Sequence, residues 1–188
     1  MPKSVTYVSG INCHPSIRKG NGRENDSDNT GPRPSHVPSS VRAGRAGQTL
    51  KQATFILRLR APRRGLLPIT DEVASWVAAQ GIDAGLLTLF CRHTSASLLI
   101  QENAAPAVRR DLEKFFDEIA PEGADLYEHD DEGPDDMPAH LKTALTQVQI
   151  SVPVMGGRLM LGTWQGIYLF EHRARPSARE IALHLIGE

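Results

Sequence analysis

The sequence has few of the features that mark secreted, membrane or nucleic-acid-binding proteins. Its 188 residues include two cysteines, Cys13 and Cys91, and their wide separation argues against a disulfide framework and for a reducing cytoplasm. No apolar stretch approaches the ~18 residues of a transmembrane helix, and the N-terminus lacks the apolar core of a secretory signal. A net charge of -1 gives no overall signal for binding to nucleic acid or to a membrane. We therefore expect a cytoplasmic protein that has neither as a partner.

The chain divides near residue 50 into two parts of different composition. Residues 1–50 hold six Gly, five Pro and one aromatic residue, Tyr7, so they cannot bury enough surface to offset the entropy lost on ordering. We predict a disordered extension at residues 1–50 and one domain at residues 51–188. The extension carries seven Lys/Arg against three Asp/Glu, which is typical of a solvated leader or a misassigned translation start. A weak polyanion-binding arm is the alternative.

Hydrophobic periodicity predicts that strands and helices are mixed along the domain. Helical spacing predicts helices at about 70–80, 106–120 and 138–145. Alternation predicts strands at about 55–60, 65–69, 86–91, 97–101, 148–154, 158–162, 166–170 and 179–186. The last four strands are expected to form an antiparallel meander, with Gly156 and Gly157 in its first hairpin turn. Because the elements do not alternate strictly as βαβ units, the fold class is α+β: a compact single domain with a mixed, mainly antiparallel sheet covered by helices.

Polar side chains gather where two of the expected strands end. The stretch "LFCRHTSASLLIQENA", residues 89–104, sets His93, Thr94 and Ser95 between two apolar runs and ends the second run at Asn103. Sites are often built at strand ends, so this cluster is a candidate pocket wall. A Ser-His-Asp hydrolase is disfavoured, because no G-x-S-x-G turn is present to expose a serine nucleophile.

Two further histidines lie near an acidic loop. His129 falls within this loop, and Asp136 and His140 are four residues apart, which places both on one helical face if the helix starts near Asp136. Imidazoles with a nearby carboxylate are the usual ligands of zinc or another borderline divalent ion. Such irregular spacing is also typical of separate structural histidines, so both interpretations stay open. His172 follows Glu171 at a strand end and is left open as a site residue or a surface residue.

Three motifs together resemble one known family. These are "HTSASLLIQEN", "YEHDDEGPDDMPAHLK" and "GTWQGIYLFEHR", and their order and separation resemble the YjbQ-type family over residues 52–188. The resemblance implies a compact α+β subunit that assembles as a homotrimer. It also implies a secondary thiamine-phosphate synthase activity, in which a pyrimidine pyrophosphate is coupled to a thiazole phosphate.

The resemblance also implies the site residues and their parts. Those expected to act in catalysis are His93, Asn103, Asp136 and His140. Those expected to contact the ligand, a small phosphorylated metabolite, are Thr94, Ser95, Gln165 and Glu171. Apart from the resemblance, Lys142 and Arg173 are candidates to neutralise its phosphate oxygens, because both side chains are basic. A divalent metal, zinc or magnesium, is expected on His93, His129 and His140, with Asp136 completing its shell or orienting an imidazole. The alternative function is a non-enzymatic homotrimeric binding protein for a metal or a small phosphate-bearing ligand.

Overall fold

The computed structural model describes residues 49–123 and 125–188. The predicted extension, residues 1–50, lies almost entirely outside the described residues. The elements in chain order are β1 (Lys51–Arg60), β2 (Gly65–Pro68), α1 (Thr70–Ala78), β3 (Ala84–Cys91), β4 (Ala96–Glu102), α2 (Pro106–Ile119), α3 (Asp136–Leu145), β5 (Gln149–Met155), β6 (Arg158–Leu159), β7 (Gln165–Glu171) and β8 (Ala178–Gly187). Among the helices that the structure describes, none is both long and apolar enough to cross a lipid bilayer.

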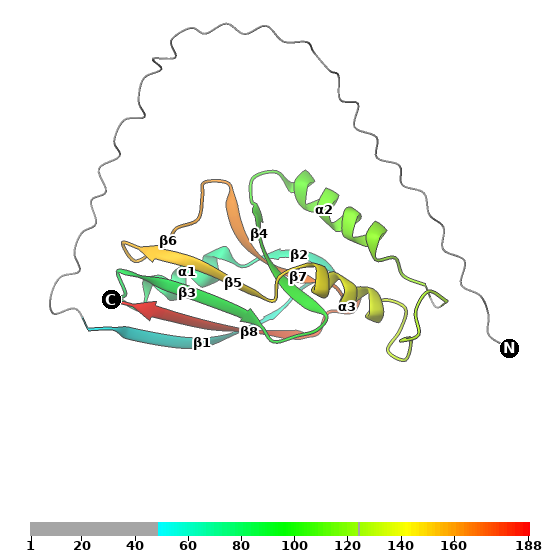
Figure 1. The fold of residues 1–188 in the computed structure, drawn as a ribbon. Helices are drawn as coiled ribbons and strands as arrows, with labels where there is room; N and C mark the ends of the chain where they lie inside the picture. Colours follow the sequence, from blue (N-terminus) through cyan, green and yellow to red (C-terminus); the bar gives the residue numbers. More distant parts are fainter. Residues whose placement is uncertain (1–48, 124) are drawn as a thin grey trace, which may run out of the picture. The chain divides into compact units, whose positions relative to one another are not determined.

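In the described part of the chain, the strands form two antiparallel sheets (Figure 1). The larger sheet has the strand order β1-β8-β3-β5-β6, and the smaller has the order β2-β7-β4. The α+β class with a mainly antiparallel sheet is therefore confirmed.

The predicted meander of the last four strands is wrong. Only its first hairpin, β5 with β6, forms, and Gly156 and Gly157 take φ values of 61° and 68° in its turn, where glycine is unstrained. Strand β7 instead lies between β2 and β4, and β8 lies between β1 and β3. Alternation within a strand shows which face is buried, but it does not show which strand is the neighbour.

The main core fills the space between the two sheets. Strand β8 contributes Ile181, Leu183 and Leu185, whose side chains alternate with more exposed neighbours and are almost fully buried. Ile167 and Leu169 of β7 belong to the same cluster. Because residues of both sheets pack in this one core, the end of β3 and the start of β4 are held in defined positions relative to each other.

Helix α2 covers the second face of β7. Tyr168 and Phe170 point away from the main core and form a smaller cluster with Leu66, against which Leu112 and Phe116 of α2 pack. The rings of Phe116 and Phe170 meet edge to face at a centroid distance of 5.2 Å. Strand β7 is therefore buried on both faces.

The outer face of the larger sheet exposes apolar side chains. Leu86 and Phe90 of β3 are 44% and 45% exposed. In the sheet register, Leu86 is paired with Ile186 and Pro153, and Phe90 is paired with Ala182. The five residues form two apolar rows, with the polar row of Thr88, His184 and Ser151 between them. We call the five apolar residues the β3 band.

Candidate functional site

The polar segment at residues 92–95 is the point where the chain passes from one sheet to the other. Strand β3 ends in the larger sheet at Cys91, and β4 begins in the smaller sheet at Ala96. The start of the crossover is fixed because the N–H of Cys91 donates to Val148 O at 2.7 Å and the N–H of Arg92 donates to Glu180 O at 3.1 Å. The side chains that follow are therefore presented from a defined backbone rather than from a long loop.

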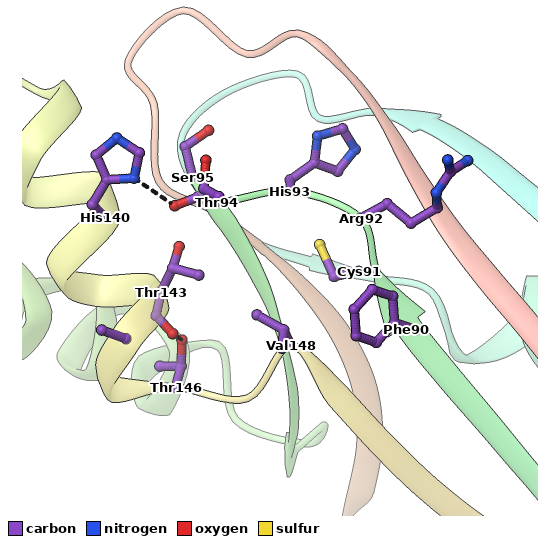
Figure 2. A pocket seen from close by; sticks show the side chains of 11 residues that line it. Phe90, Cys91, Arg92, His93, Thr94, Ser95, His140, Thr143, Thr146 and Val148 are labelled. Atoms are coloured by element: carbon purple, nitrogen blue, oxygen red, sulfur yellow. Dashed lines mark hydrogen bonds between the residues drawn. The ribbon is translucent and has the colours of Figure 1, made fainter.

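A pocket of about 950 Å³ opens beside this crossover (Figure 2). Of the predicted site residues, it brings together His93, Thr94, Ser95 and His140. The remaining lining residues are Phe90, Cys91, Arg92, Thr143, Ala144, Thr146 and Val148. None of the described residues that line the pocket is an aspartate or a glutamate. Its wall is made of apolar side chains together with histidine, arginine, serine and threonine side chains that can donate hydrogen bonds.

His129, Asp136 and His140 form a compact cluster next to the pocket. One ligand atom from each residue can be chosen so that all three lie within 4.8 Å of one another. Asp136 Oδ2 lies 2.7 Å from His129 Nε2 and 3.3 Å from His140 Nε2. Helix α3 begins at Asp136, which places this carboxylate on the same helical face as His140. The Asp136 side chain is almost fully buried, whereas both imidazoles reach solvent.

The backbone carbonyl of Thr94 fixes the tautomer of His140. His140 Nδ1 lies 3.0 Å from Thr94 O, the contact drawn in Figure 2, and a carbonyl oxygen can only accept. Nδ1 therefore carries a proton, so a neutral His140 presents the lone pair of Nε2 toward Asp136 Oδ2. Two acceptors at this distance repel each other unless a proton or a cation lies between them.

Arg173 holds the other oxygen of Asp136. Its guanidinium donates to Asp136 Oδ1, to Asp135 Oδ2 at 3.2 Å and to the carbonyl of Glu132 at 2.7 Å. Burial alone would raise the pKa of Asp135, but the N–H of Ala174 and the charge of Arg173 lower it below its usual value. These contacts tie the acidic loop to the end of β7 and leave Asp136 Oδ2 to face the imidazoles.

His93 lies in the pocket wall but outside the cluster of His129, Asp136 and His140. Its Nε2 accepts a hydrogen bond from the backbone N–H of Glu180 at 2.7 Å. Burial, followed by the charge of Arg179, lowers the pKa of the His93 imidazole. The three predicted histidine ligands are thus divided, with two in the cluster and one on the other side of Thr94 (Figure 2).

Glu171 is part of a buried ion pair and does not line the pocket. Its side chain is fully buried and binds Arg179, which is 4% exposed, through contacts of 2.7 Å to Nε and 2.5 Å to Nη2. Arg179 in turn donates from Nη1 to Ser95 Oγ at 3.1 Å. Glu171 therefore supports the pocket wall from behind, through Arg179.

Asn103 and Gln165 lie together at the far end of β4. The Asn103 side-chain amide donates to Gln165 O at 3.2 Å. Gln165 lines a second pocket of about 660 Å³, which also includes Glu102 and the exposed Trp164. The structure therefore places these two predicted site residues apart from the histidines.

Lys142 faces a different cavity. Its side chain is almost completely buried, and Nζ lies 2.5 Å from Asp117 Oδ1 of α2. With Arg63, Arg64 and Glu113, it lines a space of about 110 Å³ beneath α2. Its charge serves the contact between α2 and α3 and is not presented to the histidine pocket.

His172 is not a surface residue, and it is not among the residues that line the histidine pocket. It is almost completely buried, and its Nε2 lies 3.0 Å from Ser97 Oγ. Burial above all, followed by the charges of Lys142, Arg179 and Arg64, lowers its pKa to about 3. The interpretation of His172 as a surface residue was wrong, because a polar residue at a strand end can also turn inward.

The sequence analysis did not identify the role of Arg179 in a buried ion pair with Glu171. It also did not identify the contact between Arg173 and Asp136. A signal existed for Arg179, which lies two residues before Ile181 and so shares the inward face of β8 with Leu183. A charged residue on an apolar face needs a buried partner. No comparable signal marks Arg173, because its partners come from a loop whose path the sequence does not define.

These features define a small α+β protein with a histidine–carboxylate cluster beside an open pocket, at a crossover between two antiparallel sheets. Residues 56–188 match the family described as UPF0047 protein YjbQ-like. The chain belongs to this family, so the resemblance of its three motifs is confirmed.

Curated relatives and solved structures agree with this assignment. A UPF0047 protein of Synechocystis is 46% identical over 140 residues, which span 74% of this chain and 95% of the relative. The UPF0047 protein YjbQ of Escherichia coli O157:H7 is 45% identical over 133 residues, with coverage of 70% and 96%. A YbjQ-like protein of unknown function from Sulfolobus solfataricus superimposes with a TM-score of 0.68 at 27% identity, covering 74% of this chain and 100% of its own. A hypothetical protein from Aeropyrum pernix gives 0.66 at 31% identity, with coverage of 72% and 99%.

Proposed function

We propose that the protein binds a divalent metal ion through His129, Asp136 and His140 and holds a small phosphate-bearing molecule in the adjoining pocket. The observation that supports this most directly is the hydrogen bond from His140 Nδ1 to Thr94 O. It turns the lone pair of Nε2 toward Asp136 Oδ2, and a cation at that position would satisfy both acceptors. Metal-binding histidines commonly have their other nitrogen fixed by such a carbonyl.

The donor set favours zinc over magnesium. Two imidazoles and one carboxylate are the protein ligands of several catalytic zinc sites, which keep a fourth position for water or substrate. Magnesium prefers oxygen ligands in octahedral geometry, and the cluster of His129, Asp136 and His140 offers one carboxylate.

The protein's own groups would position the ion and the ligand. Arg173 holds Asp136 Oδ1, so that Oδ2 is directed toward the two imidazoles. Arg92 brings positive charge to the pocket, and a wall without carboxylates does not repel a phosphate. A bound zinc ion would add Lewis-acid charge at a phosphate oxygen.

A low-level thiamine-phosphate synthase activity is part of this proposal, because the family resemblance implies it. In that transfer, the pyrimidine methylene carbon exchanges its bond to pyrophosphate for a bond to the thiazole nitrogen, and pyrophosphate leaves as an anion. Of the basic groups that could neutralise it, Lys142 lies in another cavity and Arg173 is engaged by three acceptors. Among the described residues that line the histidine pocket, Arg92 is the one arginine or lysine, and it is already paired with Glu180 at 2.7 Å.

This scarcity of free positive charge supports a second candidate, a non-enzymatic binding protein. A displaced pyrophosphate needs several cationic contacts, whereas retention of one phosphate-bearing ligand needs fewer. The resemblance to homotrimeric family members leads us to propose a homotrimer in either case. The exposed β3 band offers each copy an apolar surface for contact with another.

Metal analysis tests the cluster of His129, Asp136 and His140. The full-length protein, purified and incubated with zinc, is expected to hold about one zinc ion per chain, because the three residues supply most of a tetrahedral shell. His129→Ala and His140→Ala should each lose it, while their circular dichroism and melting temperature show that the domain stays folded. His184→Ala is the matched control, since His184 lies on β8 and contacts Gln52. Stoichiometric zinc in His140→Ala would refute the metal site.

Turnover separates the two candidate functions. Release of pyrophosphate from the pyrimidine pyrophosphate and the thiazole phosphate, abolished in folded His140→Ala, would establish the synthase activity. Tight retention of a phosphorylated ligand without turnover would establish the binding protein instead.

A further inference from the structure

The His93 ring has one nitrogen that is already committed to the backbone. Its Nε2 accepts from the N–H of Glu180 at 2.7 Å, and a backbone N–H can only donate. Nε2 must therefore present its lone pair, and the neutral ring carries its proton on Nδ1. Since the ring lines the pocket, Nδ1–H is its available donor.

Burial and the backbone contact favour this neutral form of His93, while the charges around the ring act in both directions. The groups that face it are Arg179 and Glu180 of β8, Glu171 of β7 and Arg92 of the crossover. A second proton on the ring would break the bond from Glu180 N–H, because Nε2 would then be a donor facing a donor. Burial, the largest effect, and then Arg179 lower the pKa of the imidazole, whereas Glu171 and Glu180 raise it, and the net shift is downward.

Ser95 supplies a second oriented donor in the same wall. Its Oγ accepts from Arg179 Nη1 at 3.1 Å, and Arg179 is itself held by Glu171. The hydroxyl hydrogen of Ser95 is then left to donate toward the pocket. An oxyanion is a chemical group that accepts from two such donors, and no aspartate or glutamate is among the described residues that line this pocket.

We propose that His93 Nδ1–H and the Ser95 hydroxyl bind an anionic oxygen of the pocket's ligand, and that His93 is not a metal ligand. This assignment rests on the proposed function for the ligand-binding role of the pocket. The sequence analysis expected His93 to be a metal ligand and a catalytic residue, whereas this assignment makes it a hydrogen-bond donor to the bound anion. To coordinate an ion through Nδ1, the ring would have to move its proton to Nε2 and lose the contact with Glu180. His140 differs, because its own backbone contact frees Nε2 for the cluster with His129 and Asp136.

Nitrogen-15 NMR of the full-length protein tests the tautomer directly, without any ligand. The His93 resonances, assigned by comparison with His93→Gln, should show a protonated Nδ1 and an unprotonated Nε2 at pH 7. A ring protonated on Nε2 would overturn the assignment, because Nε2 could then not accept from the N–H of Glu180.

Calorimetry with zinc-loaded protein tests the role of that donor. Inorganic phosphate is the first probe, and acetate is the second, because a phosphate and a carboxylate share the oxyanion chemistry. His93→Gln should keep the full zinc content but bind phosphate about 10- to 100-fold more weakly, the effect of losing one hydrogen bond to a charged group. His93→Asn, whose amide nitrogen can occupy the place of Nδ1, should recover part of this loss.

The outcomes separate this inference from the proposed function. Loss of zinc from folded His93→Gln would make His93 a metal ligand and overturn the inference alone. Zinc binding by the wild type without any affinity for phosphate or acetate would also overturn it, while leaving the metal site intact. A wild-type protein that holds no zinc refutes the metal site, and the NMR result then decides the state of His93 independently. Binding of phosphate but not acetate would identify a phosphoryl group as the anion, and binding of both would identify any oxyanion.

Discussion

Replacement of Glu171 by alanine is expected to destabilise the domain by about 3–5 kcal/mol, the usual result of removing one partner from a buried ion pair. Glu171 Oε1 accepts from Arg179 Nη2 at 2.5 Å and from the N–H of Arg173 at 3.0 Å, and Oε2 accepts from Arg179 Nε at 2.7 Å. The substitution leaves the Arg179 guanidinium buried, with the hydroxyl and carbonyl oxygens of Ser95 as its remaining hydrogen-bond partners in the part of the chain that the structure describes. The large cost follows because that charge loses both water and its counterion.

Urea unfolding, monitored by circular dichroism, measures the effect. Glu118→Ala is the matched control, because Glu118 is 65% exposed and pairs with Lys114 at 3.7 Å, so its loss should change stability by less than about 0.5 kcal/mol. The double variant Glu171→Leu with Arg179→Met should cost less than Glu171→Ala alone, since it leaves no unpaired charge in the interior. This reasoning would be refuted if Glu171→Ala lowered the free energy of unfolding by less than about 1 kcal/mol. It would also be refuted if the double variant lost as much stability as the single variants Glu171→Leu and Arg179→Met lose together.

Two further predictions concern acid stability and assembly. The pKa of His172 is lowered to about 3 by burial and then by Lys142, Arg179 and Arg64, so the unfolded chain takes up a proton near pH 6.5 that the native protein does not accept until about pH 3. Stability should therefore fall as the pH drops through this window, by up to about 1.4 kcal/mol per pH unit from this group, and His172→Gln should show a smaller loss between pH 6.5 and 4.5 in urea titrations. Equal losses in both proteins would contradict the assignment. Light scattering at micromolar concentration should give a trimer mass for the wild type and a lower mass for Leu86→Glu, which places a charge in the β3 band; a monomeric wild type would rule out the homotrimer.

The sequence predicted the fold class well because short-range periodicity reports burial directly. The inward residues of β8 alternate in the sequence as they do in the structure. Helix α3 begins at Asp136, two residues before the predicted start at Pro138, and this start meets the condition for Asp136 and His140 to share one helical face. Strand partners were not predictable in the same way. The pairing of β7 with β2 and β4 depends on which apolar faces meet in three dimensions, and local alternation carries no record of that.

The candidate site was predicted in part for a related reason. The sequence singled out His93, His129 and His140 as chemically suitable, but the parts of His93 and His140 depend on which ring nitrogen meets a backbone group. A carbonyl faces His140 and an N–H faces His93, and these opposite partners give the two rings opposite free nitrogens. Such orientation is a property of the folded backbone, so residue type and spacing cannot provide it.

The position of Thr94 has a consequence for how the two halves of the site would communicate. Its carbonyl fixes His140, while the residues before and after it, His93 and Ser95, supply the proposed anion donors. A metal ion that locks His140 against Thr94 would also hold these neighbours in place, and part of the entropy of ordering would already be lost before the anion arrives. Thermodynamic linkage then requires reciprocity: the factor by which zinc strengthens phosphate binding must equal the factor by which phosphate strengthens zinc binding. One peptide unit would thus make the metal and the anion positive effectors of each other.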